Sequence, residues 1–357
     1  AWETFVASYP GYGVTAEAQF YLADCLYRFS RQRQLEGDAE FADSLHALAL
    51  QEDRILADAD AGRWSRLARL RLVESMAATE SDTARTRVLE QGYSAFLQQH
   101  PLTEETTEAR ARALLGLGDA RRMAALADSA KLKEADEAYR LLLVEAGQST
   151  LARRARFGRA AVALQGGQNA AAIDSLATLL PVLTGTALQP QALALLAQAL
   201  ARADRHLEAA TRLSELLLAF PDHDGRRDAQ ELLGDTYLAL GDADRAVELL
   251  SSLAGADPQG DVDGSLRLRL AQAHRLRGDA ATALNIYDRL LAQNTGPIDT
   301  LRLARGRMLA RLGRIDEAVD AFGLVRSGPL LSAARIGAAD LHFASGQFEQ
   351  ASAAYTP

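Results

Sequence analysis

The sequence predicts an all-α solenoid built from antiparallel helix pairs, and three observations predict it. Hydrophobic residues make up 48% of the 357 residues but aromatic residues only 6%, so alanine and leucine carry the apolar content, which favours helices over strands. One pattern of small and large apolar residues recurs at intervals of about 35 residues, the length of a two-helix repeat. Each interval holds two helical runs that a short turn separates.

The first part of the chain is the least regular. "RWSRLARLRL", with Trp64 and Ala68, fits the first helix of a pair, and "GYSAFLQQHP", with Tyr93 and Phe96, fits a second helix. Between such segments, "RQRQLEGDAEF" and "ATESDTART" indicate lengthened turns. We therefore expect irregular repeats over residues 1–104 and a regular array over residues 105–357, with an incomplete last repeat.

The regular array is defined by one recurring alanine. The aligned alanines are Ala135, Ala172, Ala209, Ala246, Ala283, Ala318 and Ala351. A large apolar residue follows each of them by four positions, as Tyr139, Leu176, Leu213, Leu250, Tyr287, Phe322 and Tyr355. Most copies also carry a small residue twelve positions before the alanine, as Ala160, Ala197, Gly234, Ala271, Gly306 and Ala339. This register places one small residue in each helix of a pair.

One copy, "RDAQELLGDTYLALGDADRAVELLSSLAGADP", shows how the helices end. We expect helices over 227–240 and 243–254, with Gly241 as the left-handed residue that ends the first. Asp242 is placed to cap the second helix, which Asp257 and Pro258 terminate.

Gly234 lies inside the first of these helices, where glycine costs about 1 kcal/mol relative to alanine. We interpret Gly234 and Ala246 as the contact points of two closely crossing helices, with Leu250 packed into the adjacent pair. Close packing would offset the cost of the glycine.

The residues Leu233, Gly234, Tyr237, Ala246, Leu250 and Pro258 give this copy a pattern that resembles the tetratricopeptide repeat family. The resemblance implies a right-handed superhelix of about nine repeats, some of them partial. It also implies that first helices line a concave groove that binds extended peptides or helices. The "YP" and "FP" turns loosely resemble repeat proteins of bacterial envelopes. We therefore expect an envelope (periplasmic or outer-membrane-associated) or extracellular location, with the cytoplasm as the alternative.

The sequence offers little catalytic or metal-binding chemistry. The six histidines show no metal-ligand spacing on one helix. "PDHDG" at 221–225 is expected to be a turn, and "DPQGDVDG" at 257–264 fails as a calcium loop because Leu270 stands where a bidentate Glu is needed. Cys25, the single cysteine, lies in an apolar stretch and is expected to be buried and inert. We expect no enzymatic activity, no cofactor and no metal.

Charge and hydropathy restrict the partners further. The net charge of −8 disfavours a nucleic-acid partner, and no apolar run is long enough to span a membrane. The family positions that face the groove include, in this chain, Asp228, Glu231, Asp235, Gln272, Arg275 and Arg307, with Arg311 one place beyond the last of the set. We expect a protein or peptide of mixed charge, its basic part near Glu231 and its acidic part near Arg275 and Arg307. The alternative is ion pairing between neighbouring helices, for instance of Asp235 with Arg275.

We interpret the chain as a non-catalytic scaffold for protein–protein interaction in a bacterial assembly. Its opening residues read as the second half of a helix, and its last residues stop soon after a helix begins, so we expect a segment of a longer protein. Two alternatives stay open. One is a structural subunit that self-associates into a polymer through uncapped ends, and the other is the substrate-recruiting segment of a larger enzyme.

Overall fold

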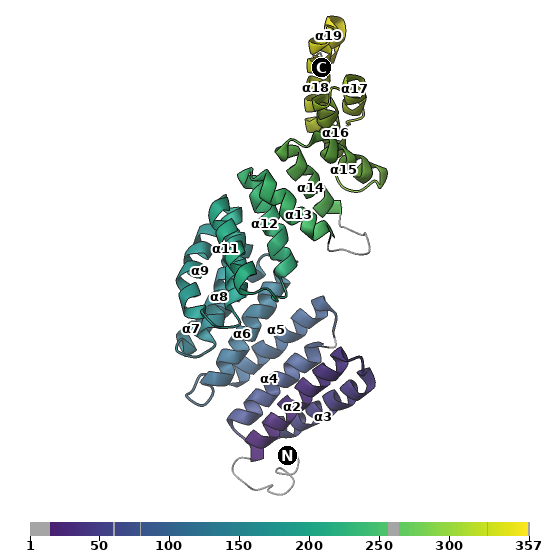
Figure 1. Cartoon of the computed structure of the whole chain (residues 1–357). Coiled ribbons are helices and arrows are strands. Elements are labelled where there is room, and N and C mark those ends of the chain that lie inside the picture. Colours follow the sequence, from purple (N-terminus) through teal and green to yellow (C-terminus); the bar gives the residue numbers. More distant parts are fainter. Residues whose placement is uncertain (1–14, 60, 79, 256–263, 327, 356–357) are drawn as a thin grey trace. The chain divides into compact units, whose positions relative to one another are not determined.

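The computed structural model of the chain describes residues 15–59, 61–78, 80–255, 264–326 and 328–355 (Figure 1). Within these ranges it contains eighteen α-helices and no strand, which confirms the all-α prediction. The chain divides into two compact units, Ala1–Gln189 and Pro190–Pro357. The division that we predict from repeat regularity, between residues 104 and 105, falls inside the first unit.

The helices form nine successive pairs, the number of repeats that the sequence predicts. Those of the first unit are α2 (Thr15–Leu35) and α3 (Ala39–Asp58), α4 (Arg63–Ala78) and α5 (Asp82–Gln99), α6 (Thr107–Ala124) and α7 (Lys131–Ala146), and α8 (Ala152–Gln165) and α9 (Asn169–Leu183). Those of the second are α10 (Gln189–Arg202) and α11 (His206–Ala219), α12 (Arg226–Leu240) and α13 (Ala243–Gly255), α14 (Gly264–Arg277) and α15 (Ala280–Ala292), α16 (Ile298–Arg311) and α17 (Ile315–Gly323), and α18 (Gly328–Ala344) and α19 (Phe348–Tyr355).

Neighbouring pairs also touch through their first helices. In the first unit α2 packs on α4, α4 on α6 and α6 on α8, and in the second unit α12 packs on α14 and α16 on α18. Within the described residues, the second helices of neighbouring pairs share no comparable packing. First helices therefore form the inner row of each stack, as the repeat pattern implies.

The turn between α12 and α13 forms as predicted. Gly241 has a φ of 74°, and the N–H of Asp242 donates to the carbonyl of Tyr237 at 2.9 Å, which is the Schellman arrangement. The Asp242 carboxylate then accepts from the N–H of Arg245 at 3.3 Å and caps α13. Asp257 and Pro258, our predicted stop for this helix, lie outside the described residues, as do residues 257–263 of the candidate calcium loop.

The small residues lie at helix crossings, but their contacts differ from our prediction. All seven aligned alanines are buried, with at most 2% of their surface exposed. A Cβ placed on Gly234 would lie 2.6 Å from Cδ2 of Leu250. Gly234 therefore makes room for Leu250 of its own pair, a contact that we did not predict. Packing against Leu250 offsets the helix propensity that the glycine lacks.

Tyr139 on α7 is a large side chain for which two glycines make room. A Cβ on Gly118 of α6 or on Gly158 of α8 would lie 2.5 Å from the Tyr139 ring. The ring is fully buried between these two first helices, one from its own pair and one from the next. A large side chain on a second helix therefore joins neighbouring pairs, and glycines on the first helices provide the space.

Two expectations for the N-terminal part are wrong. The lengthened turns are absent, because α2 continues to Leu35 and α3 begins at Ala39, while α4 ends at Ala78 and α5 begins at Asp82. The extra residues lengthen the helices instead, since Arg, Gln, Leu, Glu and Ala all have good helix propensity. Cys25 is exposed rather than buried, because α2 buries Phe20, Leu22 and Ala23 on another of its faces.

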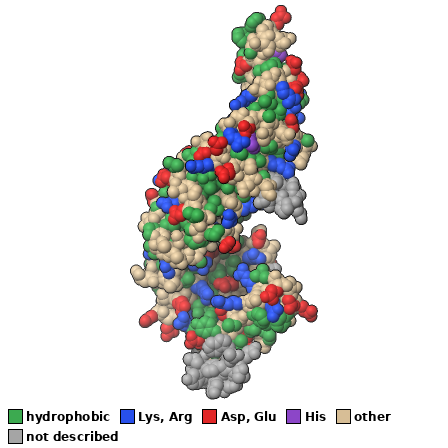
Figure 2. Space-filling model, in the orientation of Figure 1, with side chains coloured by type: hydrophobic (Ala, Val, Ile, Leu, Met, Phe, Trp, Pro, Cys, Tyr) green, Lys and Arg blue, Asp and Glu red, His purple; other side chains and the backbone are tan. Residues whose placement is uncertain are grey.

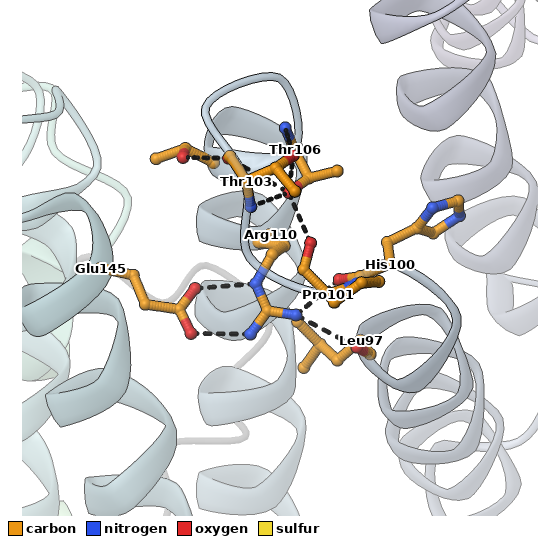
Figure 3. A network of polar contacts seen from close by, with 8 residues as sticks. Leu97, His100, Pro101, Thr103, Thr106, Arg110 and Glu145 are labelled. Atoms are coloured by element: carbon orange, nitrogen blue, oxygen red, sulfur yellow. Dashed lines mark hydrogen bonds and ion pairs between the residues drawn. The ribbon is translucent and has the colours of Figure 1, made fainter.

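A buried ion pair joins three helices of the first unit (Figure 3). Arg110 on α6 contacts both carboxylate oxygens of Glu145 on α7, at 2.9 and 2.7 Å. Its remaining nitrogen Nη1 donates to the carbonyls of Leu97, at 3.1 Å, and His100, at 2.6 Å, where α5 ends. Arg110 is only 8% exposed. The guanidinium of Arg110 thus donates hydrogen bonds to two carbonyls at the end of α5 and holds α6 against α7.

A second buried carboxylate lies between α3 and α4. Asp53 is fully buried, and Nε of Arg71 lies 3.3 Å from it. Arg71 itself lies over the ring of Phe20, with 3.8 Å from its Cζ to the ring centroid. Burial raises the pKa of Asp53 to about 6, although the charge of Arg71 opposes this shift.

We expect the substitution Asp53→Asn to remove a pH dependence of stability. The pKa of Asp53 in the folded protein exceeds its unfolded value of about 3.9, so wild-type stability falls as pH rises from about 4 to about 6. Asparagine does not titrate. The free energy of unfolding of Asp53→Asn minus that of wild type should therefore increase by about 2 kcal/mol between pH 4 and pH 7. Urea unfolding at both pH values measures this difference, and a constant difference would contradict the prediction.

Candidate functional site

The seven residues predicted to bind a partner lie on three first helices of the second unit. Helix α12 carries Asp228, Glu231 and Asp235, helix α14 carries Gln272 and Arg275, and helix α16 carries Arg307 and Arg311. Asp228, Arg307 and Arg311 are exposed, and the other four are half-buried. The structure packs α12 on α14 and links α14 to α16 through Arg275 and Arg311.

The acidic part of this set is paired within the protein. Arg269 on α14 donates from Nη1 to Glu231 at 2.9 Å, and its Nε lies 2.8 Å from Asp235. Arg227 contacts Glu231 as well, at 3.2 Å. Burial raises the pKa of Asp235 above its ordinary value, and Arg269 opposes that shift. The ion pairing between helices that we considered as an alternative is therefore present, with Arg269 in place of Arg275.

The position of Asp235 carries a carboxylate in other pairs too. There a tyrosine hydroxyl of the second helix donates to it: Tyr93 to Glu74 at 3.1 Å, Tyr139 to Asp119 at 2.6 Å, and Tyr355 to Asp340. Burial, followed by the charge of the carboxylate, raises the pKa of Tyr93 and of Tyr139. In the pair α12–α13 the second helix carries Leu250 instead of tyrosine. Asp235 therefore pairs with Arg269 on the next first helix.

The basic part of the set differs, because its arginines have no carboxylate partner among the residues that the structure describes. Arg311 donates from Nη1 to the carbonyl of Arg275 at 3.2 Å, and the side chain of Arg275 reaches the hydroxyl of Tyr287. Arg307 and Arg311 are one helical turn apart on α16. Within the described residues, none of these three guanidinium groups forms an ion pair. We call Arg275, Arg307 and Arg311 the arginine patch.

The arginine patch is a local feature of a mixed surface. On the face shown in Figure 2, basic and acidic side chains are interspersed, and neither sign forms a continuous field there. Three guanidinium groups without carboxylate partners can take up carboxylates in the bidentate geometry that favours arginine over lysine. The patch is therefore suited to an acidic peptide segment.

The described part of the chain offers no metal-binding cluster of three or more His, Cys, Asp or Glu side chains. At 221–225 the imidazole Nδ1 of His223 accepts from the N–H of Gly225 at 2.8 Å, and Arg226 donates to the carbonyl of Pro221 at 2.6 Å. These contacts shape the turn before α12. None of the helices described is both long and apolar enough to cross a membrane.

A family model described as tetratricopeptide repeat matches residues 194–261 and 268–331. Over these two segments the chain is similar to the tetratricopeptide repeat (TPR) family. The two matched segments contain all seven candidate residues, so both the acidic and the basic part of the set lie on TPR helices. This fold is that of a protein-interaction scaffold, since stacked helix pairs expose an extended binding surface.

Several solved structures are similar to this chain at low sequence identity, and among the three named here the apo form of RapI shows the same fold. The apo form of RapI is 13% identical, with a TM-score of 0.56, over 94% of this chain and 95% of that one. A TPR protein from Parabacteroides merdae is 15% identical, with a TM-score of 0.47, over 80% of this chain and 99% of that one. A Rap protein complexed with competence and sporulation factor is 17% identical, with a TM-score of 0.46, over 95% and 96% of the two chains. No curated protein matches the sequence.

Proposed function

We propose that this chain is a non-catalytic scaffold that holds another protein by an acidic segment, within a bacterial envelope or extracellular assembly. The arginine patch carries the proposal, because three arginines that form no ion pair with the described residues stand on first helices of a chain whose net charge is −8. The envelope setting rests on the sequence, on the "YP" and "FP" turns. Recovery of the protein in the cytoplasmic fraction of its source cells would contradict that setting.

The pairing around Arg269 changes the partner that we propose. Glu231 and Asp235 are already neutralised by Arg269 and Arg227, so a basic segment of the partner would gain little there. Asp228 is the exposed carboxylate of the set and is left for a cation at one end of the ligand. The proposed partner therefore places two or three carboxylates on Arg275, Arg307 and Arg311, and its charge is mainly acidic.

Selection from a random dodecapeptide display library tests this proposal. We expect peptides selected on wild-type protein to be enriched in Asp and Glu. The double substitution Arg275→Glu and Arg307→Glu should weaken their binding by at least about tenfold, since two attractive charge contacts become repulsive. The helix content should stay unchanged. The matched control is Arg212→Glu with Arg314→Glu, which reverses two exposed arginines near second helices. Equal binding by wild type and the arginine-patch variant would exclude this site.

A further inference from the structure

One hollow in the described first unit lies on its second-helix side, between α7 and α9. It has a volume of about 940 Å³ and is lined by α7, α8, α9 and the turn between the last two. Both α7 and α9 pack on α8, but they share no comparable packing with each other. Packed helices stand 8–10 Å apart, so α7 and α9 stand farther apart than that. We call this hollow the α7–α9 groove.

We propose that the α7–α9 groove binds an amphipathic helix of a partner protein that carries two acidic residues seven positions apart. This surface lies in the other unit from the arginine patch and uses second helices, so the inference does not depend on the function proposed above. It rests on the apolar lining of the groove and on the placement of its charges.

The lining offers an apolar strip for such a helix. Leu132 and Leu143 contribute from α7, Val162 from α8, and Leu179 and Val182 from α9. Val182 is 54% exposed, and Leu132 and Leu143 are half-buried. A bound helix would remove these side chains from water, which is favourable in proportion to the apolar area covered.

One ion pair fixes the register of the charged side chains along the groove. Arg159 on α8 contacts Asp136 on α7 at 2.7 Å. Lys133 precedes Asp136 by three residues on α7, and Arg156 precedes Arg159 by three residues on α8. Because α7 and α8 are antiparallel, Lys133 and Arg156 lie on opposite sides of the Asp136–Arg159 ion pair along the groove. At 1.5 Å per residue they are about 9 Å apart along the groove.

Lys133 and Arg156 are available to a ligand. Both line the groove and are exposed, and neither forms an ion pair within the described part of the chain. Two residues seven positions apart on a helix lie on one face about 10 Å apart, which matches their spacing. Asp136, which pairs with Arg159 between the two cations, and Asp174 on α9 also line the groove and would repel a further acid. The charges therefore favour acids near the two ends of the contact and apolar residues between them.

A synthetic helix tests this inference directly. The probe is a fluorescein-labelled 15-residue peptide with Glu at positions 4 and 11, Leu at positions 7 and 8, and Ala or Gln elsewhere, measured by fluorescence anisotropy. We expect it to bind wild-type protein, and the double substitution Lys133→Glu and Arg156→Glu to weaken binding by at least about tenfold, since both charge contacts become repulsive. Val182→Asp should weaken it as well. The control Arg140→Glu changes an exposed arginine of α7 outside the groove and should have no effect.

Three results would overturn the inference. The first is equal affinity for the probe and for the same peptide with Lys at positions 4 and 11. The second is loss of probe binding in the arginine-patch variant Arg275→Glu with Arg307→Glu, which would place the peptide in the second unit. The third is an outcome in which the wild-type protein does not bind the probe but self-associates in sedimentation velocity, and the double substitution Lys133→Glu and Arg156→Glu abolishes that self-association. That result would make the groove an interface between two copies of the chain.

Discussion

Replacing Glu145 by glutamine will lower the free energy of unfolding by about 3–5 kcal/mol, which is the usual cost of removing one partner from a buried ion pair. Both side chains are at least nine-tenths buried, so the guanidinium of Arg110 would remain charged and uncompensated. Arg110 also holds the carbonyls of Leu97 and His100, and its displacement would leave those acceptors unsatisfied too. Urea unfolding followed by circular dichroism measures the change.

Two further variants distinguish the loss of this ion pair from other effects of a substitution on stability. Glu137→Gln on the same helix removes an exposed carboxylate paired with Arg140 and should leave the urea midpoint unchanged, as exposed pairs contribute little. Arg110→Met combined with Glu145→Leu should recover most of the loss, because apolar replacement of a buried pair is often neutral or stabilising. If the urea unfolding midpoint of Glu145→Gln is close to that of wild type, the ion pair does not contribute to stability.

Gly158→Val should destabilise the first unit by about 3 kcal/mol, the upper range for overpacking a core. A Cβ at this position would lie 2.5 Å from the Tyr139 ring, and the ring cannot retreat because Gly118 bounds its other side at the same distance. Thermal and urea unfolding both report the loss. The control Ala177→Val adds the same side chain at an exposed position of α9 and should cost only the helix propensity of valine, about 0.5 kcal/mol.

A double-mutant cycle identifies the cause of the Gly158→Val effect. Tyr139→Ala alone should cost about 3–5 kcal/mol, as for other large aromatic residues in a core. Because the smaller side chain leaves space for valine, the two substitutions together should cost clearly less than their sum. Additive losses would show that Gly158 is needed for something other than room for the Tyr139 ring.

Much of the fold is predictable from local signals in this chain. Gly241 and Asp242 end one helix and cap the next by their own backbone and side-chain chemistry, so the turn between α12 and α13 forms where the sequence predicts it. The aligned alanines predict the buried crossings because only small residues fit there. The lengthened turns were predicted from polar composition, which is equally compatible with an exposed helix, and α2 and α3 are in fact 21 and 20 residues long.

The candidate site is less accessible to such reasoning. The family pattern places Glu231, Asp235 and Arg275 on first helices, but it does not say which cation reaches which carboxylate. Arg269 is closer to Glu231 and Asp235 only because α14 packs on α12 at one particular offset. The sequence does show that the next first helix carries arginines, Arg269 and Arg275 among them. Which of these two reaches Glu231 and Asp235 depends on how the two helices pack.

The sequence by itself determined the helix pairs, their number and the buried alanines, since helix propensity, caps and repeat spacing act within one or two turns of chain. The tertiary structure decided which side chains fill the spaces beside Gly118, Gly158 and Gly234, and which charges are neutralised. It also decided that Arg275, Arg307 and Arg311 have no carboxylate partner in the part of the chain that the structure describes, and that α7 and α9 form two walls of a groove. These features depend on distances between packed helices, within a pair and between neighbouring pairs, which the offsets and side-chain volumes of the packed stack set together.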